Sequence, residues 1–398
     1  MNTPITYDTY AYMFADLFDI KNMIDVSMGF QSIFGNPVNG GKTIFAPDAE
    51  TVNIELEGGD EKMSALIPRG INGTLQSKKG VTAVDWTNIS RVFPLSEEEG
   101  TITAAQINKK VPGEPIGKPY SRALRKQILA GKLHAAQTKR QVRMFEYLAA
   151  QSFLTGKQDA IIGTSDSNQK YDFRRHADMT FAATGVWSNP AYIGIFTDID
   201  KGCDRIRAKG RIPPRGMIVD GTTMDSMLMN TVFQQKADNR RFYDVAQIGG
   251  TLALPPEFAR MVEKGFVLRG KLMTPAGYEL FVFTYNNGYD DDSGNFVKYM
   301  PANRCVLFAP QARYDRWFGP PEMLTGPRRD RFYQEEFGIN PVGVLTRSVK
   351  DPGAVLSPEM FWFDAFPGAK EKSLTVRTQT APIFGTIHSN SVAVITGT

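Results

Sequence analysis

"PYSRALRKQILAGKLHAAQTKRQVRMFEYLAAQSFLTG", residues 119–156, decides the fold, because Gly131 is its only internal helix breaker. Pro119 suits the first turn of a helix, and Gly156 suits the stop. At 1.5 Å per residue the stretch predicts one helix of roughly 50 Å, far longer than most helices of globular domains. Its apolar side chains recur at intervals of three, four or seven residues: Leu124, Ile128, Ala135, Val142, Phe145, Ala149 and Phe153.

The opposite face of this predicted helix is strongly basic and polar. A basic face can be a solvated surface or a contact for nucleic acid, and its even spacing favours solvated charge. The residues of this face are Arg122, Arg125, Lys126, Lys132, Lys139, Arg140 and Arg143.

Before the helix, residues 44–98 read as extended chain. "TVNIELEGG" alternates Val52, Ile54 and Leu56 with polar neighbours, which is typical of a half-exposed strand, and "ISRVFPL" is a second strand. The polar, glycine-rich chain between them predicts the outer part of a protruding hairpin of about fifty residues. Such a hairpin has too little apolar surface to be stable alone, so we expect it to rest on something else.

After the helix, the pattern changes several times. Residues 158–188 open with a hairpin, "DAIIGTSDSNQKYDF", and "NPAYIGIFTDIDKGCDRIRAKG" predicts an amphipathic helix. Residues 215–345 form an α/β block, in which a capped helix, "TTMDSMLMNTVFQQK", follows the strand "GMIVDG". Strand patterns at 160–175 and 373–396 bracket this block, so it is predicted to be an insertion. "HSNS" joins the last two extended runs.

Composition sets the outer bounds. The chain has 398 residues, 42% hydrophobic and 22% charged, which predicts a globular protein of two or three domains. A net charge of +4, spread along the chain, gives no nucleic-acid-binding arm. Neither a signal peptide nor a membrane span is expected, and Cys203 and Cys305 are expected to be buried thiols in a reducing compartment.

"GNPVNGGKT", residues 35–43, resembles a phosphate-binding loop. That loop needs glycine where Asn36 stands, and Pro37 removes an N–H group that would face the phosphates. The chain after Lys42 reads as extended, whereas a phosphate loop opens a helix. The stretch therefore predicts a flexible Gly/Asn/Pro connector, and Lys42 is expected to bind no nucleotide.

Catalytic chemistry is not visible in the sequence. His134, His176 and His388 lie in unrelated elements, and "DDDSG", 290–294, lacks the spacing of a calcium loop and predicts a hairpin turn. "SEEEG", 96–100, predicts a turn or helix start. No catalytic residue, metal site, cofactor or enzymatic activity is therefore expected, and the function is predicted to be binding or structural.

The order of these segments resembles the major capsid proteins of tailed bacteriophages, which have the HK97 fold. "RGMIVDGTTMDSMLMNTVFQQKADNRR", "FVFTYNNGYDDDSGNFVKYMPANRCVLF", "LTVRTQTAPIFGTIHSNSVAVI" and "LAAQSFLTGK" are similar to motifs of the lambda-like branch, the family called major capsid protein E. In that family the third motif leads into a closing hairpin.

The resemblance implies an α+β, HK97-like capsid fold. It implies an N-terminal arm (1–47), an extended β-hairpin loop (48–98) and an inserted axial α/β domain (212–345). It also implies a peripheral domain in two parts (101–211 and 346–398) that carries the long spine helix, 119–156. The "GNPVNGGKT" stretch would then be the hinge between the arm and the extended loop.

In function, the resemblance implies a major capsid protein that self-assembles into hexamers and pentamers of an icosahedral shell around phage double-stranded DNA. The implied partners are further copies of the chain, a portal at one vertex, a scaffold or decoration protein and, weakly and non-specifically, DNA; no membrane is involved. The implied location is the virion, after assembly in the cytoplasm of the host bacterium. The expected inter-subunit contacts lie at the outer end of the extended loop: Gly70, Ile71, Asn72, Gln76, Lys78, Lys79 and Val81.

Some relatives of this fold join a lysine of the extended loop to an asparagine of a neighbouring subunit. That reaction needs a neutral amine, but Lys78 and Lys79 lie among polar residues that keep ammonium groups hydrated. The lambda-like branch is generally strengthened by decoration trimers, so a non-covalent shell is predicted. Two alternatives stay open: another phage structural protein, such as a tail tube or decoration protein, and a nucleotide-dependent enzyme that uses Lys42.

Overall fold

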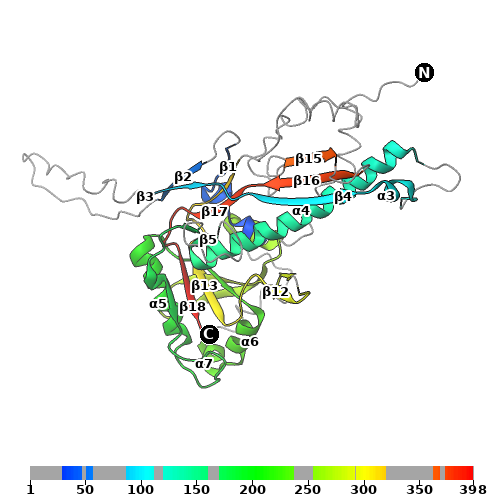
Figure 1. Cartoon of the computed structure of the whole chain (residues 1–398). Coiled ribbons are helices and arrows are strands. Elements are labelled where there is room, and N and C mark those ends of the chain that lie inside the picture. Colours follow the sequence, from blue (N-terminus) through cyan, green and yellow to red (C-terminus); the bar gives the residue numbers. More distant parts are fainter. Residues whose placement is uncertain are drawn as a thin grey trace, which may run out of the picture.

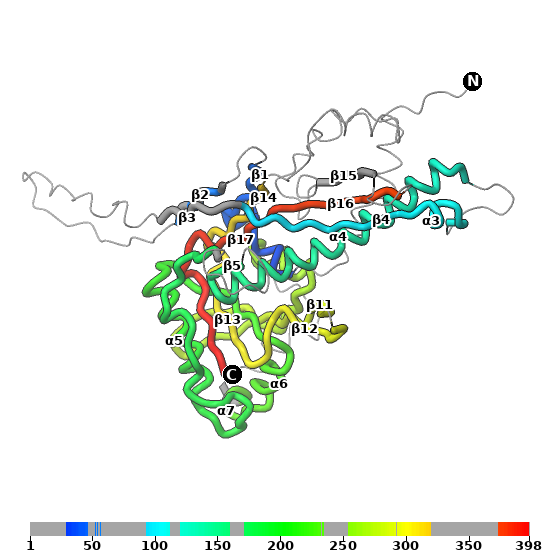
Figure 2. Tube along the Cα trace, viewed as in Figure 1, coloured from blue at the N-terminus to red at the C-terminus, as the bar shows by residue number. Residues whose placement is uncertain are grey.

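The protein has an elongated part built on one long helix and a rounded part built on a six-stranded sheet (Figure 1). The tube in Figure 2 shows that the long helix passes above the rounded part. The structure is a computed structural model, and it describes residues 29–46, 51–56, 87–111, 120–159, 170–236, 254–291, 293–319, 362–367 and 373–397.

The long helix is α4, Arg122–Thr155. It begins at Ser121, whose side chain accepts a hydrogen bond of 3.2 Å from the N–H group of Leu124. It ends at Gly156, which closes the last turn with φ at 71°. The helix predicted over 119–156 is confirmed, and it continues through Gly131, which is buried.

A three-stranded antiparallel sheet lies along α4. Its order is β15 (Trp362–Pro367), β16 (Leu374–Thr380) and β4 (Ser96–Ile102). The turn or helix start predicted for residues 96–100 is wrong, because these residues form most of β4. The helix α3, Ala104–Asn108, follows β4 and is fixed by a capping box between Thr103 and Gln106.

Helix α4 and this sheet meet through both apolar and polar side chains. A Cβ atom on Gly100 would lie 2.7 Å from Cδ2 of Leu133, so the absence of a side chain lets the helix approach β4 closely. Further along α4, the side chains of Gln137 and Gln141 donate to the carbonyl oxygens of Val376 (3.0 Å) and Thr378 (2.8 Å). These bonds satisfy buried backbone groups and fix the register of helix and strand.

The base of the predicted hairpin is also present. β2, Thr51–Leu56, pairs with β3, Thr87–Val92, in an antiparallel ladder that sets Ile54 opposite Ile89. The predicted strands are therefore confirmed.

A third sheet consists of β1 (Thr43–Phe45), β14 (Tyr314–Phe318) and β17 (Pro382–Thr386), with β1 parallel to β14. The hairpin predicted after the long helix is confirmed, because β5 (Lys157–Asp159) pairs with β6 (Lys170–Asp172).

The rounded part contains the six-stranded sheet. Its order is β7 (Thr180–Ala182), β18 (Val392–Thr396), β13 (Arg304–Phe308), β8 (Gly216–Val219), β10 (Glu279–Thr284) and β9 (Val267–Met273). Its helices are α5 (Ile195–Arg205), α6 (Gly221–Met229), α7 (Thr231–Lys236) and α9 (Pro256–Glu263). A single π-helical turn, Ile206–Gly210, continues α5. A short hairpin, β11 (Gly288–Asp290) and β12 (Phe296–Lys298), confirms the turn predicted at 290–294.

The sheet corrects two expectations. The last extended runs do not form a closing hairpin, because β17 pairs with β14 whereas β18 pairs with β13 and β7. The boundaries at 212 and 346 also divide this sheet, because β7 and β18 lie outside 212–345. The helix predicted over 222–236 is interrupted as well, since Asn230 separates α6 from α7.

Candidate assembly surfaces

Residues 29–46 form a wedge between the long helix and the six-stranded sheet. The 3₁₀ turn η1, Phe30–Ser32, is completely buried. The ring of Phe30 lies 5.7 Å from that of Phe153 on α4 and 5.2 Å from that of Tyr285, which follows β10. Aromatic pairs at these separations are favourable, so the wedge joins the two parts of the molecule.

Glu146 is the polar centre of this junction. Its carboxylate accepts hydrogen bonds from the N–H groups of Phe30 (2.6 Å) and Gln31 (3.1 Å) and from the hydroxyl group of Tyr285 (2.6 Å). Burial raises the pKa of Glu146 to about 7, although these hydrogen bonds act in the opposite direction. One buried acid thus links the wedge, the helix and the sheet.

Sequence reasoning missed Glu146, but a signal was present. Glu146 lies four residues after Val142 and seven before Phe153, on the apolar face of the predicted helix. An acid on an apolar face needs a partner inside the fold.

The "GNPVNGGKT" segment is held in place by the rest of the chain. The N–H group of Gly35 donates to the carbonyl oxygen of Tyr314 (2.8 Å), and the 3₁₀ turn η2, Pro37–Asn39, is capped by the buried Asn36. A Cβ atom on Gly41 would lie 2.6 Å from that same oxygen of Tyr314. The predicted flexible connector is therefore wrong, because packing and hydrogen bonds from distant residues fix the segment.

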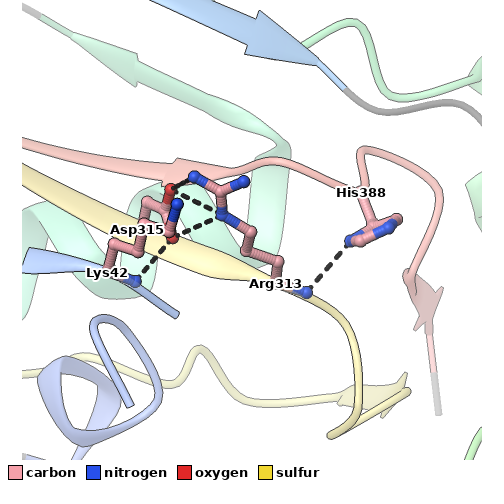
Figure 3. Close-up of polar contacts among 4 residues, drawn as sticks. All are labelled: Lys42, Arg313, Asp315 and His388. Atoms are coloured by element: carbon pink, nitrogen blue, oxygen red, sulfur yellow. Dashed lines mark hydrogen bonds and ion pairs between the residues drawn. The ribbon is translucent and has the colours of Figure 1, made fainter. Parts of the chain in front are cut away.

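Lys42 belongs to a clasp between three distant segments (Figure 3). Its backbone N–H group donates to Oδ1 of Asp315 at 2.7 Å, and Arg313 donates to the same carboxylate from Nε and Nη2. The N–H group of Arg313 in turn donates to Nδ1 of His388 at 3.0 Å. The exposed side chain of Lys42 is followed by the strand β1, so the extended chain predicted there is confirmed.

The base of the extended loop packs on its own subunit. Val52, Ile54 and Leu56 are buried in one cluster with Trp317 and Ile383, among others. The expectation that another chain covers the apolar face of this hairpin is therefore wrong for its base. The expected contact residues all lie outside the described part of the chain: Gly70, Ile71, Asn72, Gln76, Lys78, Lys79 and Val81.

The reactive groups of the described residues are structural. Cys203 and Cys305 are buried free thiols, as predicted, and burial raises the pKa of both. Burial lowers the pKa of His134 to about 4, so this ring is neutral near pH 7. Within the described ranges no cluster of His, Cys, Asp or Glu could hold a metal ion. None of the helices that the structure describes is long and apolar enough to cross a membrane.

Comparison with known families identifies the chain. The sequence model described as phage major capsid protein E matches residues 47–330, which is most of the chain. The chain belongs to the phage major capsid protein E family. It is accordingly a structural protein that forms the shell of a phage head. No curated protein matched the chain.

Solved structures support the fold. A prophage protein of Escherichia coli CFT073, described as a capsid protein, is 14% identical, with a TM-score of 0.57 over 97% of this chain and 98% of that one. The mature capsid of bacteriophage PhiM1 is 9% identical, with a TM-score of 0.39 over 90% of this chain and 86% of that one. The first likeness places this major capsid protein in the HK97-like fold.

Proposed function

We propose that the protein assembles into hexamers and pentamers that close an icosahedral shell around phage double-stranded DNA. The family match over residues 47–330 carries this proposal. The joined architecture supports it, because the wedge at 29–46 ties helix α4 to the six-stranded sheet and gives a subunit that can transmit load across a thin shell.

The parts of the subunit have separate roles in this proposal. The six-stranded sheet and its helices form an axial domain, which comprises most of residues 212–345 together with β7, α5 and β18. The long helix and the sheet of β4, β15 and β16 form the peripheral domain. Residues upstream of the wedge form the N-terminal arm. The rotation axes of the capsomers lie at the axial domain, and the peripheral domains meet between capsomers.

The extended loop reaches a neighbouring subunit. Its base is fixed by the buried residues of β2, whereas the sequence between residues 57 and 86 is polar and rich in glycine. A fixed base with a polar outer part suits a contact made between subunits. The proposed contacts are those of the outer part: Gly70, Ile71, Asn72, Gln76, Lys78, Lys79 and Val81.

DNA contact is weak and non-specific in this proposal. The exposed basic side chains of α4 include Lys132, Lys139 and Arg143, and the net charge of the chain is only +4. Such a surface attracts phosphate without holding it tightly, which suits a lining that confines DNA. A scaffold or decoration protein and a portal complete the proposed set of partners. The protein performs no catalysis, and the shell forms in the host cytoplasm and ends in the virion.

Electron microscopy and sedimentation of the expressed protein test the proposal. We expect capsomers or closed shells, from the protein alone or with a co-expressed scaffold. A stable monomer of 44.2 kDa under every condition, scaffold included, would contradict it.

A further inference from the structure

One end of the axial domain exposes large apolar side chains. We call it the neutral tip: the loop 183–194 together with the junction of α6 and α7 at 229–231, at the end where Figure 1 labels α7. Val186, Ile193 and Met229 are 58%, 73% and 69% exposed. Exposed apolar side chains that gather in one place mark an interaction surface more often than scattered ones do.

The two parts of the neutral tip are bonded to each other. The side chain of Asn230 donates to the carbonyl oxygens of Asn189 (3.0 Å) and Tyr192 (2.9 Å). The hydroxyl group of Thr231 donates to the carbonyl oxygen of Pro190 at 2.8 Å. Ile193 and Met229 are therefore held on one connected surface.

A buried carboxylate fixes the loop from below. Asp198, on α5, accepts hydrogen bonds from the hydroxyl groups of Thr184 (2.5 Å) and Tyr192 (2.9 Å) and from Nε1 of Trp187 (3.2 Å). Trp187 is fully buried beneath the loop. Because the loop is anchored in this way, its apolar side chains cannot turn inward without breaking these bonds, and the surface is preorganised for binding.

The neutral tip also lacks charge. Residues 179–197 contain no Asp, Glu, Lys, Arg or His, and neither do residues 226–235, although 22% of the chain is charged. The exposed residues of this stretch, Ser188 and Asn189 among them, are polar but neutral. Nucleic acid as the partner would need basic side chains here, and the tip has none.

Neutrality points to self-contact. Copies of one chain around a rotation axis bring the same residues close to one another, so any charge at the axis would meet its own sign. A rigid, neutral and partly apolar surface avoids this repulsion and still buries apolar area. We propose that the neutral tip is where copies of this chain meet one another around the axis of each capsomer. This inference rests on the proposed shell-forming function and assigns the contact to particular residues.

Opposite charges at one position test this contact. Ile193→Glu and Ile193→Lys place like charges together in each pure preparation, so we expect assembled particles to fall at least about tenfold in each. An equal mixture of the two variants sets opposite signs side by side and should restore assembly. Ile193→Gln, which matches glutamate in shape without its charge, is the control and should assemble far better than either.

The outcomes separate this inference from the proposed function. If the wild-type chain forms no shell, the proposed function fails. If the wild type and Ile193→Glu assemble equally, or if the mixture does not recover, only the self-contact is overturned. The thermal transition of the isolated Ile193→Glu subunit should stay unchanged. A large loss of subunit stability would instead show that another segment of the same chain covers the tip, which also overturns the proposal.

Discussion

The carboxylate of Glu146 on α4 accepts a hydrogen bond of 2.6 Å from the hydroxyl group of Tyr285, which follows β10 in the axial sheet. The same carboxylate holds the backbone of Phe30 and Gln31. Three segments that are far apart in the sequence therefore depend on one buried ionisable group.

This dependence predicts a pH-dependent stability. The pKa of Glu146 is raised from 4.5 to about 7 in the folded subunit, so its contribution is full below pH 4.5 and is lost as the pH rises through 7. The loss amounts to about 3 kcal/mol. Glu146→Gln removes this titration, so its free energy of unfolding should vary less between pH 5 and pH 8 than that of the wild type. Urea unfolding of isolated subunits at both pH values measures the difference.

Tyr285→Phe provides the second variant. The hydroxyl group of Tyr285 lowers the pKa of Glu146, so its removal should move the loss of stability to higher pH. Equal pH dependence in the wild type and in Glu146→Gln would show that Glu146 does not titrate in this range.

A second prediction concerns the packed segment at 35–43. Gly41→Ala places a methyl group 2.6 Å from the carbonyl oxygen of Tyr314, so it should destabilise the subunit by about 1–3 kcal/mol. Val38→Ala is the matched control, because Val38 is 54% exposed in the same segment, and its effect should stay within about 0.5 kcal/mol. A flexible connector would tolerate both changes equally in thermal unfolding.

The third prediction separates the base of the extended loop from its outer part. A short Gly/Ser turn in place of residues 70–83 should leave the thermal transition of isolated subunits nearly unchanged and prevent shell formation. Ile54→Ala, in the buried base, should instead cost the subunit about 2–5 kcal/mol. A large loss of stability from the shortened loop would show that its outer part folds on its own subunit.

Lys42 is expected to bind no nucleotide. Its contact with Asp315 uses the backbone N–H group, so Lys42→Ala should preserve the clasp and leave unfolding within about 0.5 kcal/mol of the wild type. Calorimetric titration of the wild type with ATP and Mg²⁺ should release no heat of binding. Nucleotide binding that disappears in Lys42→Ala would refute the expectation.

The mature shell is predicted to be non-covalent. Particles boiled in detergent should give a single band near 44.2 kDa on a gel. A ladder of covalent oligomers that vanishes in a Lys78→Ala/Lys79→Ala variant would overturn this prediction.

Local signals in the sequence were sufficient for the long helix. Its apolar period is uninterrupted, and Gly156 marks its end because only a left-handed residue closes the last turn without strain. The strands of the extended loop followed from the alternation of Val52, Ile54 and Leu56. Each of these features depends on neighbours within a few residues.

Pairing between distant segments could not be predicted in the same way. Alternation shows that residues 382–396 are extended, but it does not show that β17 pairs with β14 while β18 pairs with β13. Glu97 and Glu98 looked like a turn because their partners are remote: Arg377 on β16 and Arg140 on α4. Glycine and asparagine likewise suggested flexibility at 35–43, where Tyr314 and Asp315 impose order from far along the chain.

The place of β18 has a consequence for biosynthesis. This strand, Val392–Thr396, lies between β7 and β13 in the axial sheet. A ribosome makes β7 and β13 well before it reaches residue 392, so until then the edges of both strands lack the partner that joins them. Open strand edges favour aggregation during folding. A truncated product that ends before residue 392 cannot complete the axial sheet, and we expect incomplete translation products to be kept out of the growing head.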